Sequence, residues 1–288
     1  DRINLFKKSA VWAFGAVSAL FTFLPESFFA IKKWLISDIV AKNLATGTIE
    51  IAEMNVFINR CLCFAAIWIL AAVVYGTFLK FKWFVTIKGK NYTIKIEYGN
   101  LLKVKKCRKV ISFDECYTTQ IGTNPGDIKP TSICGQYLRE NPNLNMQQLI
   151  TNANLLPEST KSKYQNKDRY KSGSIVQNGN DLLLAFAPLD VNGRGIFSSR
   201  SEYITCLSTM WEELHKYYNQ QDISISILGS GQTYIDGNSG TSLSQQELLD
   251  IIILSYKLSP HKIKYPHKLR IICRKSDGFS LNDIDSKS

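Results

Sequence analysis

The sequence predicts an α/β domain that follows a hairpin of two membrane-spanning helices. The densest apolar runs of this 288-residue chain all lie before Lys80. From Trp83 onward these runs give way to alternating strands, polar turns and helical periods. A strand, a glycine-rich turn and an apolar helix then follow one another over residues 223–256. We therefore predict three parts: a hairpin over residues 1–82, an α/β domain over residues 83–275 and a tail over residues 276–288.

Charge and cysteine content narrow the classes of function. Formal net charge is +11, and the part from Lys80 onward holds 28 Lys or Arg against 19 Asp or Glu. Such a basic part suits an anionic ligand or an anionic membrane surface. Nucleic acid is the competing partner, but no basic helix or basic–aromatic interleaving is present, so we expect none. Seven cysteines without a repeated spacing indicate free thiols in a reducing compartment and predict no metal site.

The first predicted span begins with the uncharged run of sixteen residues from Ser9 to Leu24. As a helix this run covers about 24 Å, less than the roughly 30 Å hydrocarbon core. We expect the span to continue through a kink at Pro25, over about residues 9–29. A secretory signal peptide is the alternative. A retained helix is favoured because no small-x-small cleavage site follows and a second apolar segment comes later.

The second predicted span, Cys61–Leu79, has nineteen uncharged residues, about 28 Å as a helix. The alternative, a buried core helix, is rarely apolar on all sides over this length. Residues 32–60 are expected to form an amphipathic connection on the far membrane surface, with a disordered loop as the alternative. Lysines flank the outer ends of both spans, which places both termini and the α/β domain of this multi-pass protein in the cytosol. These lysines are Lys7, Lys8, Lys80, Lys82, Lys88 and Lys90.

The first half of the α/β domain is predicted to hold three strands. Residues 83–88 and 92–98 alternate as strands around a Gly-containing hairpin turn, and residues 109–113 form a short buried strand. Asp114 and Glu115 stand at the carboxyl end of this third strand, the edge where open α/β sheets bind ligands. The loop over residues 117–130 is either a binding loop or ordinary surface structure.

The second half is predicted to alternate strands and helices. Residues 141–172 are polar and are expected to be a mobile insertion or lid with one short helix at 146–153. The remaining predicted elements are strands at 174–177 and 182–187, a helix at 201–219, a last strand at 268–274 and a frayed tail after it. Three histidines lie outside any nucleophile motif and are interpreted as structural.

The segment that organises the domain is the glycine-rich turn after the strand 223–228. Gly229 and Gly231 let backbone amides point toward one place, which forms a nest for phosphate. Ser244 and Glu247 have the spacing of a capping box and predict the start of an apolar helix. A turn of this kind with nothing bound is an equally good interpretation of the spacing alone. Tyr234 is predicted either to border a ligand or to pack on the core.

Three places in the order of these parts resemble a macro domain, the three-layer α/β/α module that binds ADP-ribose. They are Tyr98-Gly99-Asn100-Leu101-Leu102, Phe113-Asp114-Glu115 with the loop after it, and the turn from Leu228 to Tyr234. The resemblance implies that Asn100 lies at the adenine-recognising position. It also implies ligand contacts from Asn100, Asp114, Glu115, Gly122, Thr123, Gly229, Ser230, Gly231, Gln232, Thr233 and Tyr234. Because Asn100 replaces an aspartate and the paired asparagines of hydrolytic macro domains are missing, the resemblance predicts no catalytic residue and no enzyme.

A two-helix hairpin followed by a divergent macro domain is similar to the membrane effector of type II Thoeris, a bacterial anti-phage system. This resemblance implies that a partner TIR-domain protein makes an ADP-ribose conjugate such as histidine-ADP-ribose. The macro domain then binds the signal, and homo-oligomers of the chain disrupt the bacterial cell membrane and kill the infected cell. It implies no cofactor besides this signal ligand. The alternatives are a membrane-tethered ADP-ribosyl hydrolase and a scaffold that binds ADP-ribose or a protein partner.

Overall fold

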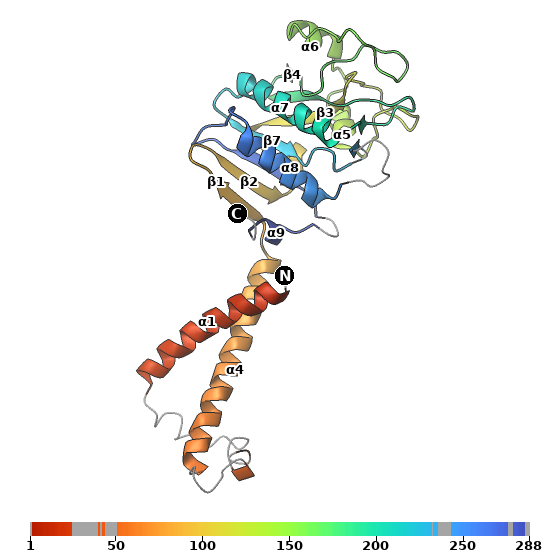
Figure 1. The fold of residues 1–288 in the computed structure, drawn as a ribbon. Helices are drawn as coiled ribbons and strands as arrows, with labels where there is room; N and C mark the ends of the chain where they lie inside the picture. Colours follow the sequence, from red (N-terminus) through yellow and green to blue (C-terminus); the bar gives the residue numbers. More distant parts are fainter. Residues whose placement is uncertain are drawn as a thin grey trace. The chain divides into compact units, whose positions relative to one another are not determined.

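The computed structural model divides the chain into two compact units, Asp1–Lys82 and Trp83–Ser288. It describes residues 2–24, 40, 42–43, 51–231, 233–235, 243–275 and 279–285. Figure 1 draws these residues in colour.

Two antiparallel helices form the first unit, α1 (Arg2–Phe23) and α4 (Ile51–Lys80). Near one end of the pair, the Phe6 ring lies edge-on to Trp68 with 4.7 Å between centroids. The indole N–H of Trp68 also donates a hydrogen bond to Ser9 Oγ over 3.3 Å. Near the other end, the Arg60 guanidinium lies over the Phe21 ring, 5.6 Å from its centroid. An aromatic and polar contact therefore joins the helices at each end of the pair.

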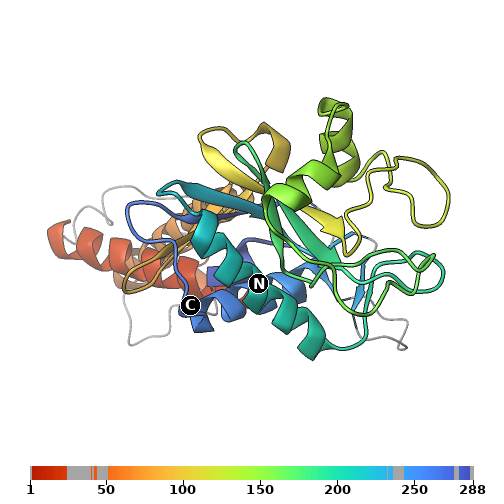
Figure 2. The same ribbon diagram turned by 90° about the horizontal axis from the view of Figure 1, so that it is seen from above.

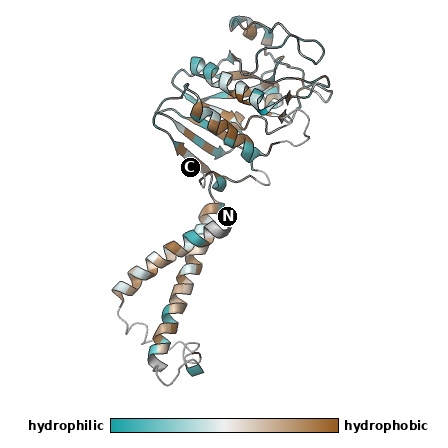
Figure 3. Ribbon diagram, in the orientation of Figure 1, coloured by the Kyte–Doolittle hydropathy of each residue, from teal (hydrophilic) through white to brown (hydrophobic). Residues whose placement is uncertain are grey.

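Helix α4 is the one helix in the described part of the chain that is long and apolar enough to cross a bilayer, over Glu53–Lys80. Its most apolar stretch is unburied, unlike the core helix of a soluble fold. Figure 3 colours the helix by hydropathy. Within the described residues α1 does not meet the same criteria, and the expected extension over 25–29 lies outside them. Length and composition therefore support one span, and the multi-pass arrangement stays a prediction.

The predicted connection at 32–60 differs from the structure at its end. Residues 51–60 form the first turns of α4, so the helix begins about ten residues before the predicted span. Two polar residues of these turns are paired, because Asn59 donates a side-chain hydrogen bond to Asn55 Oδ1 over 3.1 Å. Such side-chain pairs one turn apart support a helix. Most of the remaining connection lies outside the described residues.

In the described part of the second unit, seven strands form one mixed sheet in the order β1-β2-β9-β7-β3-β5-β4 (Figure 1). Strands β2, β9, β7, β3 and β5 run parallel, while β1 and β4 pair antiparallel at the two edges. The strands are β1 (Phe84–Lys88), β2 (Thr93–Tyr98), β3 (Cys107–Asp114), β4 (Ile175–Asn178), β5 (Asp181–Ala187), β7 (Asp222–Ser226) and β9 (Leu269–Cys273). A small parallel pair adds β6 (Ile196–Phe197) and β8 (Tyr234–Ile235).

Helices cover both faces of the sheet, so the predicted three-layer α/β/α architecture is confirmed (Figure 2). Alternate residues of β3 and β5 point into two separate cores: Val110 and Leu182 pack with α7 and α8, whereas Ile111 and Leu183 pack with α5 and α6. The helical segments are η1 (Leu101–Lys103), α5 (Ile133–Glu140), α6 (Met146–Asn152), α7 (Arg200–Tyr217), α8 (Gln245–Leu258) and α9 (Asn282–Asp285).

Local sequence signals placed most elements within two residues, and the capping box is confirmed. Ser244 Oγ accepts from the Glu247 amide over 3.2 Å, and the Glu247 carboxylate accepts from the Ser244 amide over 2.8 Å. Helix α5 is an addition to the predicted elements. Its short sequence contains glycine and few apolar residues, but Ser132 caps it by accepting from the Gly135 amide over 2.9 Å.

Two segments expected to be loose are attached to the domain. In the insertion, Ser162 is buried and the Tyr170 amide donates to the backbone of Glu115 over 2.8 Å. In the tail, Leu281 and Ile284 are buried in the core, and the Leu281 amide donates to the Tyr98 hydroxyl over 3.4 Å. The expectation of a frayed tail is therefore wrong for residues 279–285, because their apolar side chains belong to the core that also holds Ile94 and Ile96 of β2.

We expect Leu281→Ala to destabilise the domain by about 2–5 kcal/mol, because a side chain that is 1% exposed leaves a cavity. Urea unfolding of the full chain, followed by near-UV circular dichroism, measures the change. Leu258→Ala is the matched control and should stay within about 0.5 kcal/mol, since Leu258 is 75% exposed. Equal unfolding midpoints for the two variants would show that the tail does not pack in solution.

Candidate functional site

A cavity of about 1120 Å³ lies at the carboxyl ends of the parallel strands. This is the edge at which open α/β sheets bind ligands, and the volume is at the upper end of the range for small-molecule sites. Eight of the predicted binding residues line it: Asn100, Asp114, Thr123, Gly229, Ser230, Gly231, Thr233 and Tyr234. Glu115 and Gly122 do not line it, and Gln232 lies outside the described residues.

The glycine-rich turn after β7 presents free backbone amides to this cavity. Gly229 has φ of +85°, and a Cβ there would contact Ile235 Cδ1 at 3.3 Å, so only glycine fits without strain. Within the described part of the chain, the amides of Gly229 and Gly231 have no hydrogen-bond acceptor, whereas the Ser230 amide and hydroxyl both bond to the Ile227 carbonyl. Two donors at a bend form a nest that suits an anionic oxygen.

Tyr234 borders the cavity instead of packing on the core. Its side chain is 43% exposed, and its amide donates to the Gly195 carbonyl over 2.9 Å. This bond belongs to the short β6–β8 pair, which brings the loop after β5 next to the glycine-rich turn. A Cβ on Gly195 would come within 2.9 Å of Ala187 Cβ, so this approach also needs a glycine.

Asn100 and Asp114 use part of their hydrogen-bonding capacity within the protein. Asn100 Oδ1 accepts from the Leu102 amide over 3.0 Å and so caps η1. Asp114 Oδ1 accepts from the amides of Cys116 and Thr118 over 2.8 and 3.1 Å. Burial nevertheless raises the pKa of Asp114, because desolvation outweighs these hydrogen bonds. Burial also raises the pKa of the Cys116 thiol to about 11, so this thiol is protonated and weakly nucleophilic at neutral pH.

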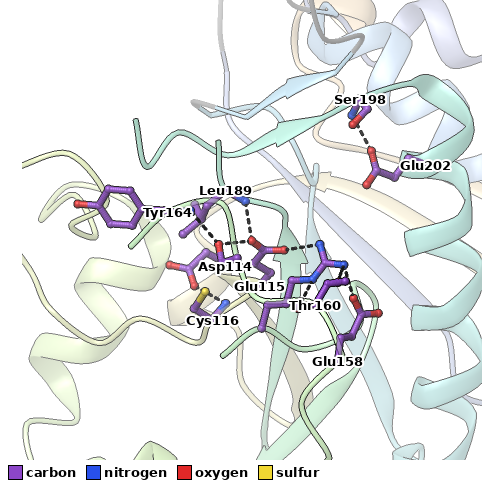
Figure 4. Close-up of polar contacts among 11 residues, drawn as sticks. Asp114, Glu115, Cys116, Glu158, Thr160, Tyr164, Leu189, Ser198 and Glu202 are labelled. Atoms are coloured by element: carbon purple, nitrogen blue, oxygen red, sulfur yellow. Dashed lines mark hydrogen bonds and ion pairs between the residues drawn. The ribbon is translucent and has the colours of Figure 1, made fainter. Parts of the chain in front are cut away.

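Glu115 differs from the prediction, because its carboxylate points into the protein and not into the cavity. It is 2% exposed and accepts from the Leu189 amide over 3.1 Å and from the Ser162 hydroxyl over 2.5 Å (Figure 4). The Arg169 guanidinium lies 3.7 Å away and supplies the opposite charge. Strand β3 ends at Asp114 and Glu115 lies in the turn after it, so one carboxylate lines the ligand site and the other anchors the insertion.

The insertion, residues 141–172, also holds the loop over residues 117–130 in place. The Tyr164 hydroxyl donates to the Pro125 carbonyl, and its ring occupies the space that a Cβ on Gly126 would need. A Cβ on Gly193 would come within 2.6 Å of the Gly126 amide nitrogen. Three segments from separate parts of the sequence therefore meet here without room for further side chains. Gly122, predicted to contact the ligand, packs instead against the Asp127 carboxylate in this loop.

Basic side chains outnumber acidic ones around the cavity. Lys129, Arg194, Arg274 and Lys275 line it, against Asp114 and Asp127. In the described part of the chain, none of these four cations has a carboxylate partner, so the cavity has an excess of positive charge for an anionic ligand. The sequence analysis did not select them. Arg274 and Lys275 directly follow β9, while Lys129 and Arg194 lie in the loops after β3 and β5. These places were the available signal, since ligand sites gather at strand ends.

Comparisons with known proteins identify related sequences. Residues 94–274 match the family model for the macro domain of the Thoeris protein ThsA. The Thoeris protein ThsA of Bacillus amyloliquefaciens (strain Y2) is 25% identical over 210 residues, which cover 69% of this chain and 68% of that protein. A mutant of the Oceanobacillus iheyensis macrodomain has a TM-score of 0.41 at 10% identity, covering 67% of this chain and 90% of that chain. A second mutant, with ADPR, has a TM-score of 0.40 at 10% identity, covering 70% and 93%.

The raised pKa of Asp114 predicts a pH-dependent stability. The folded protein holds this proton more tightly than the unfolded chain, whose aspartates have a pKa of about 3.9. Stability is therefore lost as pH rises from that value through the raised pKa of the folded state. Asp114→Asn keeps the Oδ1 acceptor and removes the titration.

We expect Asp114→Asn to gain stability relative to the unmodified chain between about pH 4 and about pH 7, by more than the roughly 0.5 kcal/mol of a surface change. Urea unfolding at both pH values measures the gain. Asp190→Asn is the control, because Asp190 Oδ1 also accepts two backbone amides but is only half-buried. A pH-independent difference for Asp114→Asn would contradict the prediction.

Proposed function

We propose a function from one premise, which the match over residues 94–274 establishes: this chain belongs to the family of the Thoeris ThsA macro domain. The macro-like domain binds an ADP-ribose-derived signal, such as histidine-ADP-ribose, that a TIR-domain protein makes on infection. Binding drives the chains to assemble, and the amino-terminal helices then disrupt the bacterial cell membrane. The infected cell dies, which makes the protein an anti-phage effector.

The observation that carries the proposal is the cavity, where two amides lack an acceptor and four cations lack a carboxylate partner among the described residues. The amides of Gly229 and Gly231 supply directed donors for a diphosphate, and Arg194, brought beside the glycine-rich turn by the β6–β8 pair, supplies positive charge. Hydrogen bonds to charged groups are each worth about 1.5–3 kcal/mol. A diphosphate is the part of an ADP-ribose conjugate that needs such donors, whatever its far end carries.

The domain binds its ligand without turnover in this proposal. Asp114 is the cavity carboxylate nearest to the strand ends, but its Oδ1 is held by two backbone amides of the following turn. The Cys116 thiol is protonated at neutral pH. Glu115 is bonded to the insertion. None of these groups is arranged as an activated nucleophile with a base.

The membrane part of the proposal rests on α4 and on the lysines that flank the hairpin. Residues Glu53–Lys80 are long and apolar enough to span a bilayer, and α1 packs along them. Lys80 is the last residue of α4 and Lys82 comes two residues later, which favours a cytosolic domain. For binding to act as a switch, the ligand must prefer the assembled state. About 5.5 kcal/mol of differential binding moves the equilibrium from almost fully off to almost fully on.

Calorimetry with ADP-ribose and the purified full chain tests the ligand site. We expect binding by the unmodified chain and at least about a 100-fold loss in Gly231→Glu, because a like charge beside a phosphate costs several kcal/mol. A Cβ at Gly231 meets nothing within 4 Å, so the fold should tolerate the change, and Gly231→Ala is the control with retained affinity. A titration of the unmodified chain without heat would favour the scaffold that binds a protein partner. Release of ADP-ribose from modified protein, lost in Asp114→Ala, would favour the hydrolase.

Dye release from vesicles tests the membrane step. The full chain in vesicles with anionic lipid should release trapped dye when ADP-ribose or histidine-ADP-ribose is added. Gly231→Glu should release none above background, because it cannot bind the signal. Equal leakage with and without the nucleotide in both proteins would reject a ligand-operated membrane effector while leaving the binding result intact.

A further inference from the structure

Lys275 belongs to two neighbourhoods at once. It lines the cavity as the second residue after β9. Its ammonium also lies over the Trp83 ring, 4.6 Å from the centroid, and 5.4 Å from the centroid of Tyr98. Within the described part of the chain Lys275 has no carboxylate partner. The positive charge is therefore held only by the faces of two aromatic rings, which is a weak attachment at an exposed position.

Trp83 stands where the helical hairpin ends and the domain begins. Helix α4 ends at Lys80, and β1 begins at Phe84. The Trp83 backbone is fixed, because its carbonyl accepts from the Tyr98 amide over 3.1 Å. Trp83 is 58% exposed, and the Lys275 ammonium lies over its ring. In the covalent chain, Trp83 is three residues after Lys80, the last residue of α4.

We propose that Lys275 couples the cavity to this junction: an anionic ligand draws its ammonium off Trp83 and Tyr98 and into the site. The inference rests on the proposed function, since it requires an anion in the cavity. It adds a ligand-contacting residue to the site and a route from ligand to hairpin. A cation on exposed rings gains about 0.5–1 kcal/mol, whereas a charge-assisted bond to a phosphate oxygen gains more, so a bound anion wins the competition.

The proposal predicts opposite effects for the two partners of one contact. Removing the Trp83 ring takes away the nearer of the two aromatic contacts of Lys275 and leaves Tyr98, so Trp83→Leu should bind ligand more tightly. The loss of a cation–aromatic contact of about 0.5–1 kcal/mol corresponds to about a two- to fivefold gain in affinity. Removing the charge has the reverse effect, and Lys275→Met should bind about three- to tenfold more weakly. A purely structural role for Lys275 would weaken binding in both variants.

The experiment combines calorimetry with tryptophan fluorescence on the full chain, with ADP-ribose as the probe. The emission change of the unmodified chain minus that of Trp83→Leu gives the response of Trp83 itself. We expect ligand to produce this Trp83 response in the unmodified chain. The response should vanish in Lys275→Met, although that variant still binds ligand at higher concentration. Lys95→Met is the control: Lys95 lies 5.0 Å from the Phe84 ring centroid, pairs with Glu97 and does not line the cavity. It should leave both readouts unchanged.

The outcomes separate the two levels of the proposal. Binding with no Trp83 response, or equal affinity in Lys275→Met and the unmodified chain, overturns the coupling and leaves the binding function standing. No heat with the unmodified chain overturns the binding function, and the coupling falls with it. Tighter binding in Trp83→Leu together with a lost response in Lys275→Met supports the coupling.

Discussion

The parallel pairing of β2, β9, β7, β3 and β5 is the constraint on which the rest of this domain depends. Parallel strands place all their carboxyl ends at one edge, and the turns that leave them there carry backbone groups without strand partners. The glycine-rich turn after β7 is the clearest case, since Gly229 has φ of +85° and the amides of Gly229 and Gly231 have no acceptor among the described residues. The cavity exists because several chain segments end together, not because one motif encloses it.

Charge is divided between structure and ligand at the end of β3, where Asp114 is the last strand residue and Glu115 begins the turn. Glu115 is a buried carboxylate, which is stable only because a guanidinium and two hydrogen-bond donors surround it. It fastens the insertion to the sheet edge and so helps to fix the loop around Gly126. Asp114, one residue earlier, faces the cavity, while the cations there have no carboxylate partner within the described residues. The result is a cavity whose positive charge is available to a ligand.

The junction between the two units combines aromatic rings with lysines. Trp83 and Phe84 are each more than half exposed, and each has a lysine ammonium over its ring. Aromatic and basic residues beside an apolar helix are typical of a membrane–water interface. The same residues therefore suit two roles in the proposed function, contact with lipid and communication with the cavity. A weak contact is appropriate for the second role, because a strong one could not be exchanged for a ligand.

Local patterns in the sequence determined the elements of this protein, because the bonds that form them are local. The capping box at Ser244, the alternation in the strands and the apolar length of α4 each depend on residues within one or a few turns of the chain. The strand-end rule likewise placed Asp114 and Gly229 at the cavity. Tertiary structure decided which neighbours those residues meet. The register shift at Phe113/Asp114 and the pairing with β5 turned Glu115 inward, and strand order brought the loop after β5 and the end of β9 to the cavity. Such contacts join residues far apart in sequence, so no local period encodes them, and only the packed sheet fixes them.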